Sequence, residues 1–346
     1  MPQTRKALAV LLGTLAALVA GELLLRIAGA APEVAPVRQG RMQLSANPRL
    51  VFEPVPGLRH EGDPSGFFEY RGQSNSLGYR DREHSVEKPP GTYRIAVLGD
   101  SIAAGYRIER TEDAFPARLE ALLRARGLPV EVLSFGVTGY NTAQEVETLR
   151  ARALRFDPDL VLLAYCHNDR RPPDPRIIQG LREAQGGRRV VPLTAVDRRL
   201  AWSALYRLLR FQVLDSAARE DAGAAAAGEQ AVARSLDDLG RMSREEGFEV
   251  LLAVFPYLPK LYDKEHARQH ARLAEIARRN GFHHLDLRPV FRDCRLARPD
   301  KLRFDRYHPT AAGHRCAAEA MAETVRPIFR RAAARPDGAP VPPSAR

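Results

Sequence analysis

Apolar and polar stretches alternate along most of this chain in an order that predicts strands separated by helices. The stretch 94–99 is almost entirely apolar, and so are 130–135 and 159–165. Short apolar runs of this kind are typical of strands buried on both faces of a sheet. Predicted strands lie near 94–99, 130–135, 159–165, 248–255 and 283–287, and predicted helices near 113–126, 141–155, 229–246, 263–280 and 310–330. This alternation favours an α/β fold with a parallel sheet covered by helices on both faces.

A different pattern occupies the N-terminus. Arg5 and Lys6 precede an apolar stretch that runs to Ala31 and is interrupted by Glu22 and Arg26, which stand one helical turn apart and could pair. About 20 apolar residues are enough to cross a bilayer. A basic start followed by an apolar core also fits a cleaved secretory signal peptide. We expect an uncleaved signal anchor, a transmembrane helix, with the rest of the chain periplasmic or extracellular.

These patterns divide the chain into four parts. Residues 1–31 form the anchor, and 32–90, rich in Pro, Gly and Arg, form a linker and an irregular cap. Residues 91–330 form the α/β domain, which contains an insertion at about 170–230. Residues 331–346 are rich in Pro and Ala, and we expect a disordered tail.

The insertion allows two interpretations. It carries a helical run from Arg198 to about Ala217 that contains Trp202, Tyr206 and Phe211. Apolar residues at helical spacing predict core packing. The run also follows a segment at a strand end directly, so a lid over the ligand crevice is equally compatible with the pattern.

Charge and composition exclude some classes of partner. Lys and Arg number 53 and Asp and Glu 42, so the formal net charge is +11. The arginines are spread along the predicted helices, without the basic runs and interleaved aromatics that follow nucleic acid, and we expect no nucleic-acid partner. A basic surface could still favour acidic polymers or anionic lipid headgroups.

The three cysteines, Cys166, Cys294 and Cys316, cannot all pair with one another. Cys166 ends a predicted strand and should pack as a small apolar side chain. Cys294 and Cys316 could pair in an oxidising compartment, but a domain of this size does not need a disulfide, and we expect none. No group of His, Cys and carboxylate residues has zinc-site spacing, so we expect neither a metal nor another cofactor.

Candidate chemistry lies where the predicted strands end. Ser101 follows the first strand in the sequence Gly-Asp-Ser, Gly136 ends the second, and Asn168 follows the third. Asp305 stands three residues before His308, in a turn that precedes the last helix. Serine at its free pKa is a poor nucleophile and needs a base that a carboxylate orients, and these residues supply both. The simpler alternatives are a helix cap at Ser101 and a turn glycine at Gly136.

Taken in this order, the four segments resemble the SGNH/GDSL hydrolase superfamily, whose name refers to Ser, Gly, Asn and His. The resemblance covers roughly residues 75–330. Ile102 stands where the family name has Leu, and Cys166 stands where the family often has Gly. The matching segments are Gly99-Asp100-Ser101, Ser134 to Gly139, His167-Asn168-Asp169 and Asp305-x-x-His308.

The resemblance implies a flavodoxin-like three-layer α/β/α fold and a role for each matching residue. Ser101 would attack an acyl carbonyl, His308 would take its proton, and Asp305 would hold the imidazole tautomer. The backbone N–H groups of Ser101 and Gly136 and the amide of Asn168 would form the oxyanion hole. Outside these roles, we expect Asp100 to stabilise the turn that presents the serine, and His314 to lie on the surface of the last helix.

We therefore expect a membrane-anchored serine ester hydrolase that acts outside the cytoplasm on O-acylated envelope glycans or lipid esters. One alternative is an O-acyltransferase that modifies a cell-envelope or exported polysaccharide and depends on a membrane partner for its acyl donor. Another is a non-catalytic glycan-binding module. The expected partners are an ester-bearing small molecule or glycan and, through the N-terminal helix, the membrane.

Overall fold

A parallel sheet forms the centre of the computed structural model, which describes residues 2–30, 42–45, 47–61, 71–173, 199–200, 202–209 and 222–334. Its five strands stand in the order β6-β5-β7-β8-β9, and each pairs with its neighbours in parallel. The strands are β5 (Tyr93–Gly99), β6 (Val130–Gly136), β7 (Leu160–Tyr165), β8 (Glu249–Val254) and β9 (His283–Asp286). The predicted parallel sheet is therefore confirmed.

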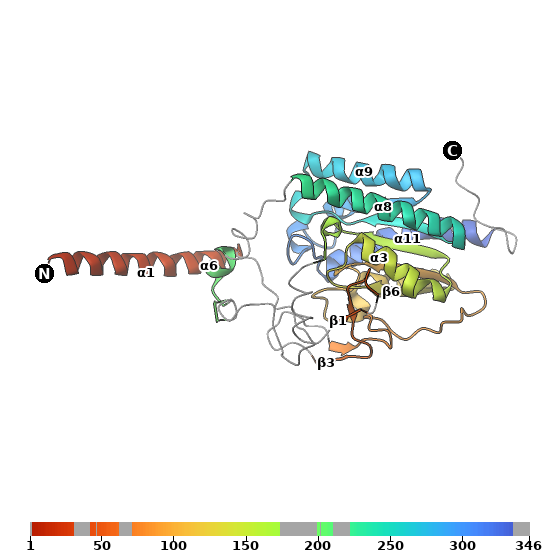
Figure 1. The fold of residues 1–346 in the computed structure, drawn as a ribbon, viewed down its shortest axis with the longest axis horizontal. Helices are drawn as coiled ribbons and strands as arrows, with labels where there is room; N and C mark the ends of the chain where they lie inside the picture. The colour runs from red at the N-terminus through yellow and green to blue at the C-terminus, as the bar shows by residue number, and fades with distance from the viewer. Residues whose placement is uncertain are drawn as a thin grey trace.

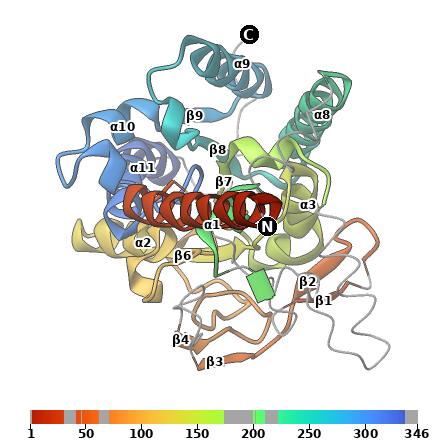
Figure 2. The ribbon, with the colours of Figure 1, turned by 90° about the vertical axis from the view of Figure 1, so that its left-hand side faces the viewer.

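Helices cover both faces of this sheet (Figures 1 and 2). One layer comprises α2 (Phe115–Ala125), α10 (Arg288–Asp293) and α11 (Ala311–Ala333), and the other α3 (Thr142–Thr148), α8 (Ala222–Glu246) and α9 (Lys264–Asn280). Short helical turns join these elements: η1 (Thr111–Asp113), η2 (Leu149–Ala153), η3 (Leu154–Phe156), η4 (His167–Arg170), η6 (Leu258–Lys260) and η7 (Pro299–Lys301). The three-layer α/β/α fold expected from the sequence is confirmed.

Strand β5 shows why its sequence lacks a polar face. Ile95 and Val97 pack into the hydrophobic cluster beneath α2 and α11, whereas Ala96 and Leu98 pack into the cluster beneath α3 and α8. Successive side chains of a strand point to opposite faces, so a strand covered on both sides carries apolar residues on both. The exception is Arg94, near the start of β5, which is buried and paired with Glu131 at 2.9 Å. The strand ends at Gly99, and the candidate nucleophile follows at the edge where such folds bind ligands.

The N-terminal helix α1 (Pro2–Ala28) projects away from the domain (Figure 1). Its segment Ala9–Ala28 has a mean hydropathy of 2.0 and no buried residues, so it is long and apolar enough to cross a membrane. A signal sequence would have the same properties.

The cap region contains regular structure that the sequence analysis did not predict. Two small antiparallel sheets pair β1 (Met42–Leu44) with β2 (Phe52–Pro54) and β3 (Arg59–Glu61) with β4 (Arg71–Gln73). Phe52 is fully buried, and its carbonyl accepts a 2.5 Å hydrogen bond from the Tyr140 hydroxyl. The first of these sheets is thereby joined to the α/β domain.

Two expectations about side chains were wrong. Cys294 and Cys316 form a disulfide, because α10 packs against α11 and brings their Cα atoms to 6.2 Å. His314 is 1% exposed rather than on the surface, since it lies on the α11 face that packs against α2. There His314 Nδ1 accepts a hydrogen bond from the backbone N–H of Phe115. Cys166 is buried and unpaired, as expected.

Within the described part of the insertion, core packing is wrong for Trp202, and the lid interpretation stays a prediction. Helix α6 (Ala204–Arg207) lies against the end of α1 (Figure 1), and the Trp202 side chain is 66% exposed. Phe211 and the predicted tail from residue 335 onward lie outside the described residues.

Candidate active site

Ser101 lies in the turn that follows β5, and the carboxylate of Asp100 organises this turn. Asp100 Oδ1 accepts a hydrogen bond from the backbone N–H of Ile102 at 2.8 Å, and Asp100 Oδ2 lies 3.2 Å from Ser101 Oγ. Asp100 is fully buried, and Ser101 is 6% exposed. Asp100 thus shapes the turn, as the sequence analysis expected.

The structure brings Ser101, His308 and Asp305 into one hydrogen-bonded line. Ser101 Oγ lies 2.8 Å from His308 Nε2, and His308 Nδ1 lies 2.7 Å from Asp305 Oδ2. The other carboxylate oxygen, Asp305 Oδ1, accepts the backbone N–H groups of Tyr307 at 2.8 Å and His308 at 2.9 Å. One carboxylate therefore sets both the turn and the orientation of the imidazole.

The charge of Asp305 determines which nitrogen of His308 carries the proton. Burial raises the pKa of this carboxyl, but the hydrogen bonds from the His308 ring and from two backbone N–H groups outweigh burial and lower the pKa to about 2. An ionised Asp305 accepts a hydrogen bond from the His308 Nδ1–H, which leaves Nε2 as an acceptor facing the Ser101 hydroxyl. The Tyr106 ring lies 4.3 Å from the imidazole, centroid to centroid, and packs against it.

Asn168 reaches the same turn from η4. Its Nδ2 donates to Asp100 Oδ2 at 2.8 Å, which places the amide beside Ser101. An amide NH₂ carries two hydrogens, so one is left to donate to a substrate. The structure thus brings Asn168 beside the candidate nucleophile.

Gly136, by contrast, points its N–H away from Ser101. On β6 the backbone N–H groups of Val132 and Ser134 point away from the neighbouring strand. They donate hydrogen bonds to the carboxylates of Glu120 and Asp81, respectively, at 2.7 Å. N–H groups alternate between the two sides of a strand, so Gly136 shares the outward side. The next N–H, that of Val137, bonds the Gly99 carbonyl of β5 at 3.0 Å.

Gly136 has a packing role that the sequence analysis did not expect. A Cβ atom at this position would collide with the backbone of Ala103 and Ala104, in the turn that follows Ser101. Glycine is needed there because it lets the two segments approach closely.

Gly139, in the same loop, offers a backbone N–H that the sequence analysis did not assign. It has φ +87°, and its N–H has no hydrogen-bond partner among the described residues. Nearby, Asn141 Nδ2 donates to the Arg171 carbonyl at 2.9 Å, so this loop lies beside the end of η4, close to Asn168. The signal in the sequence is a second glycine in the Gly segment, at a turn just before the capping residue Asn141.

Two further acids are buried beside this site. Burial, together with the charge of Asp100, raises the pKa of Glu145 well above its usual range, and neither Glu145 oxygen has a partner within the described part of the chain. Burial also raises the pKa of Asp169, whose Oδ2 accepts the Cys166 N–H at 2.8 Å. A protonated Glu145 avoids an uncompensated charge beneath the site.

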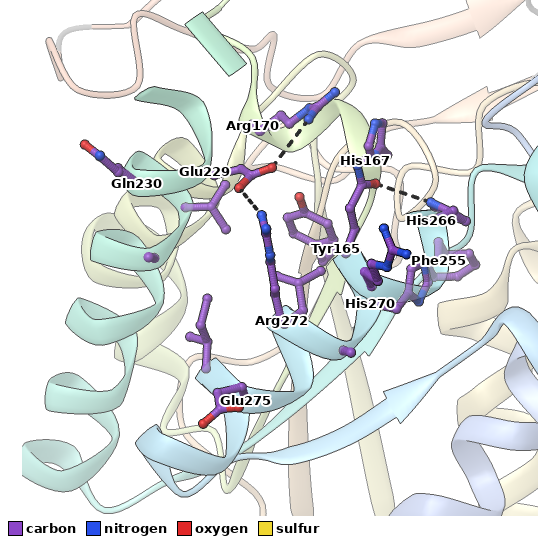
Figure 3. A pocket seen from close by; sticks show the side chains of 17 residues that line it. Tyr165, His167, Arg170, Glu229, Gln230, Phe255, His266, His270, Arg272 and Glu275 are labelled. Atoms are coloured by element: carbon purple, nitrogen blue, oxygen red, sulfur yellow. Dashed lines mark hydrogen bonds and ion pairs between the residues drawn. The ribbon is translucent and has the colours of Figure 1, made fainter. Parts of the chain in front are cut away.

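A separate cavity of about 770 Å³ lies between α8 and α9 (Figure 3). Glu229 stands at this cavity and pairs with Arg272 at 2.9 Å and Arg170 at 3.8 Å. The lining of the cavity also includes Tyr165, Phe255, His270, Leu273 and Ile276. None of the residues of the Ser-His-Asp line belongs to this lining, so the cavity is distinct from the catalytic candidates.

Within the described ranges no group of three or more His, Cys, Asp or Glu residues is arranged to hold a metal ion.

Comparisons with known proteins were made at three levels. The sequence model of the GDSL-like lipase/acylhydrolase family matches residues 97–316. No curated protein matches the chain. Solved structures that match include TesA, with 18% identity, 68% of this chain and 99% of that chain covered, and a TM-score of 0.43. They also include the acetylxylan esterase Axe2 from Geobacillus stearothermophilus, with 14% identity, 68% and 94% coverage and a TM-score of 0.46.

Proposed function

Because the chain belongs to the GDSL-like lipase/acylhydrolase family, we propose that it is a serine ester hydrolase that forms an acyl-enzyme on Ser101. The observation that carries the proposal is the line from Ser101 Oγ to His308 Nε2, at 2.8 Å, and from His308 Nδ1 to Asp305, at 2.7 Å. These are hydrogen-bond distances suited to proton transfer from the nucleophile to the base.

In this mechanism the Ser101 oxygen attacks the acyl carbonyl while His308 Nε2 takes the hydroxyl proton. The developing oxyanion accepts hydrogen bonds from the backbone N–H groups of Ser101 and Gly139 and from the Asn168 amide. The C–O bond to the alcohol then breaks, and His308 returns the proton to that alcohol. Water, activated by the same imidazole, hydrolyses the acyl-enzyme and releases the acid.

The surroundings of the nucleophile favour a short acyl group. Ser101 is only 6% exposed, and the Tyr106 ring packs on the imidazole of His308. Such an enclosed nucleophile suits an acetyl-sized group carried on a larger alcohol. We propose O-acylated envelope glycans as substrates, with lipid esters as the alternative.

Two features support a site of action outside the cytoplasm. Helix α1 is apolar and long enough for a membrane anchor, with the basic Lys6 before its apolar segment. The Cys294–Cys316 disulfide is the second feature, because disulfides persist in oxidising compartments.

The test uses the full chain in detergent, a fluorophosphonate probe and p-nitrophenyl esters of increasing acyl length. We expect labelling and acetate hydrolysis in the natural chain, both lost in Ser101→Ala. Ser235→Ala is the matched control, since its hydroxyl bonds only the carbonyl of Ala231 in its own helix. Labelling without hydrolysis would favour an acyltransferase that lacks its acceptor. A folded protein with neither would contradict the proposal and favour a glycan-binding module.

A further inference from the structure

The end of the N-terminal helix is joined to the insertion through one carboxylate. Glu22 Oε1 accepts the backbone N–H of Ala204 at 2.8 Å, and Glu22 Oε2 accepts the Ser203 hydroxyl at 2.8 Å and the Leu205 N–H at 2.9 Å. Glu22 Oε1 also pairs with Arg26 at 2.6 Å. A carboxylate at the first N–H groups of α6 satisfies donors that the helix itself leaves unpaired.

Arg26 adds a second connection. Its guanidinium donates to the Trp202 carbonyl at 2.8 Å and lies 5.9 Å from the centroid of the Trp202 ring. The ring itself is 66% exposed, and Leu209, beyond α6, is 48% exposed. Polar contacts therefore hold this segment while Trp202 and Leu209 face outward.

The elements next to Trp202 and Leu209 indicate that a lipid bilayer covers these side chains. Helix α1 exposes Leu and Val along its whole apolar length, so a bilayer is the environment that accommodates it. Glu22 and Arg26 stand near the end of this apolar segment, where paired charges are tolerated at the membrane boundary. Tryptophan is enriched at the same depth, where its ring is apolar and its N–H meets water.

We propose that Glu22, Arg26 and residues 202–209 form an interface clamp, in which Trp202 and Leu209 enter the headgroup region of the bilayer that α1 spans. The partner is the lipid surface, and the clamp goes beyond the proposed esterase activity, on which it does not depend. It also requires that α1 remains attached, because Glu22 and Arg26 belong to α1.

The clamp has a consequence for the active site. Gly228, near the start of α8, packs against the Arg170 carbonyl at the end of η4, so α8 begins at the edge where β7 ends. Figure 1 shows α1 leaving the domain at the end where α8 begins. The edge that carries Ser101 is therefore at the end of the domain from which α1 leaves.

The experiment uses the natural fluorescence of the full chain, because Trp202 is its only tryptophan. The protein is reconstituted into phosphatidylcholine vesicles with bromine atoms either near the headgroup end of the acyl chains or near their methyl end. We expect the shallow bromines to quench about half of the emission, the deep ones much less, and aqueous iodide to have little effect. Strong iodide quenching with no effect of bromine would overturn the proposal.

Two variants test whether the hydrogen bonds of the clamp, rather than closeness to α1 alone, hold Trp202 at the bilayer. Glu22→Ala should expose Trp202 to iodide and remove bromine quenching, while Thr14→Ala, whose hydroxyl bonds only within α1, should change neither. Ser203→Ala weakens the same cap without altering α1 and should give a smaller shift in the same direction. If α1 stays inserted, as carbonate extraction shows, and both cap variants retain natural quenching, the clamp is wrong.

Discussion

The Asn168 side-chain amide donates a hydrogen bond to the buried carboxylate of Asp100 over 2.8 Å. The same carboxylate accepts a hydrogen bond from the Ile102 N–H and lies 3.2 Å from Ser101 Oγ, so one acid joins the loop after β7 to the nucleophile turn after β5. The second N–H of Asn168 is thereby oriented by a residue that does not itself react.

Replacement of Asn168 tests this arrangement. Asn168→Ala should lower kcat for p-nitrophenyl acetate about a hundredfold or more, because one oxyanion donor is lost. Asn280→Ala is a matched control, since its amide bonds Asp237 between α8 and α9 and should leave kcat unchanged. A wild-type kcat in Asn168→Ala would show that this residue is not part of the oxyanion hole.

Asp305→Asn should keep the fold and lose most of the activity. The amide can no longer hold the proton on His308 Nδ1, so Nε2 ceases to act as the base, and we expect kcat to fall by about a thousandfold or more. Steady-state kinetics and a melting curve of the variant provide the measurement. A loss of activity matched by unfolding would instead indicate a structural role for the carboxylate.

The two glycines after Ser134 should respond differently to alanine. Gly139→Ala places a side chain at φ +87° beside the proposed oxyanion donor, and should reduce kcat more than it reduces Tm. Gly136→Ala forces a methyl group into the Ala103–Ala104 backbone and should cost about 1–3 kcal/mol of stability. An unchanged kcat in Gly139→Ala would mean that Gly139 is not an oxyanion donor.

Stability should fall in acid through buried histidines. Burial lowers the pKa of His314 to about 3 and that of His266 to about 4, both below the ordinary value of 6.5. The unfolded chain therefore takes up protons first as the pH falls below 6.5, and stability decreases until the pH passes the folded pKa. His314 alone should account for about 2 to 3 kcal/mol between pH 7 and pH 4.5.

Urea unfolding of the natural chain and of His314→Gln at these two pH values provides the check. The variant should be less stable at pH 7 but should lose less stability between the two values. An identical pH dependence in both proteins would contradict the assignment.

The number of cysteines that react with a thiol reagent should depend on their burial and on the disulfide. Burial raises the pKa of the Cys166 thiol, so the native protein should not react with a thiol reagent. Denatured without reductant, the chain should show one thiol, and after reduction all three. Three thiols before reduction would mean that Cys294 and Cys316 do not pair.

Much of the architecture was predictable from the sequence, for a local reason. The strand 94–99 is apolar from Ile95 onward because neighbouring helices cover both of its faces, and the parallel sheet follows from the alternation of such strands with helices. The residue types of the candidate site were also readable, since Ser101, Asn168 and the Asp305/His308 pair stand at strand ends or in a turn.

The tertiary structure decided what depends on neighbours that are distant in sequence. The outward direction of the Gly136 N–H depends on β6 having β5 on only one side, and the burial of His314 depends on α2 covering one face of α11. The approach of Cys294 to Cys316 and the docking of the insertion on Glu22 likewise require contacts between separate elements. Hydrophobic periodicity determines which elements form, but the direction of a hydrogen bond or the partner of a side chain is determined only when those elements pack.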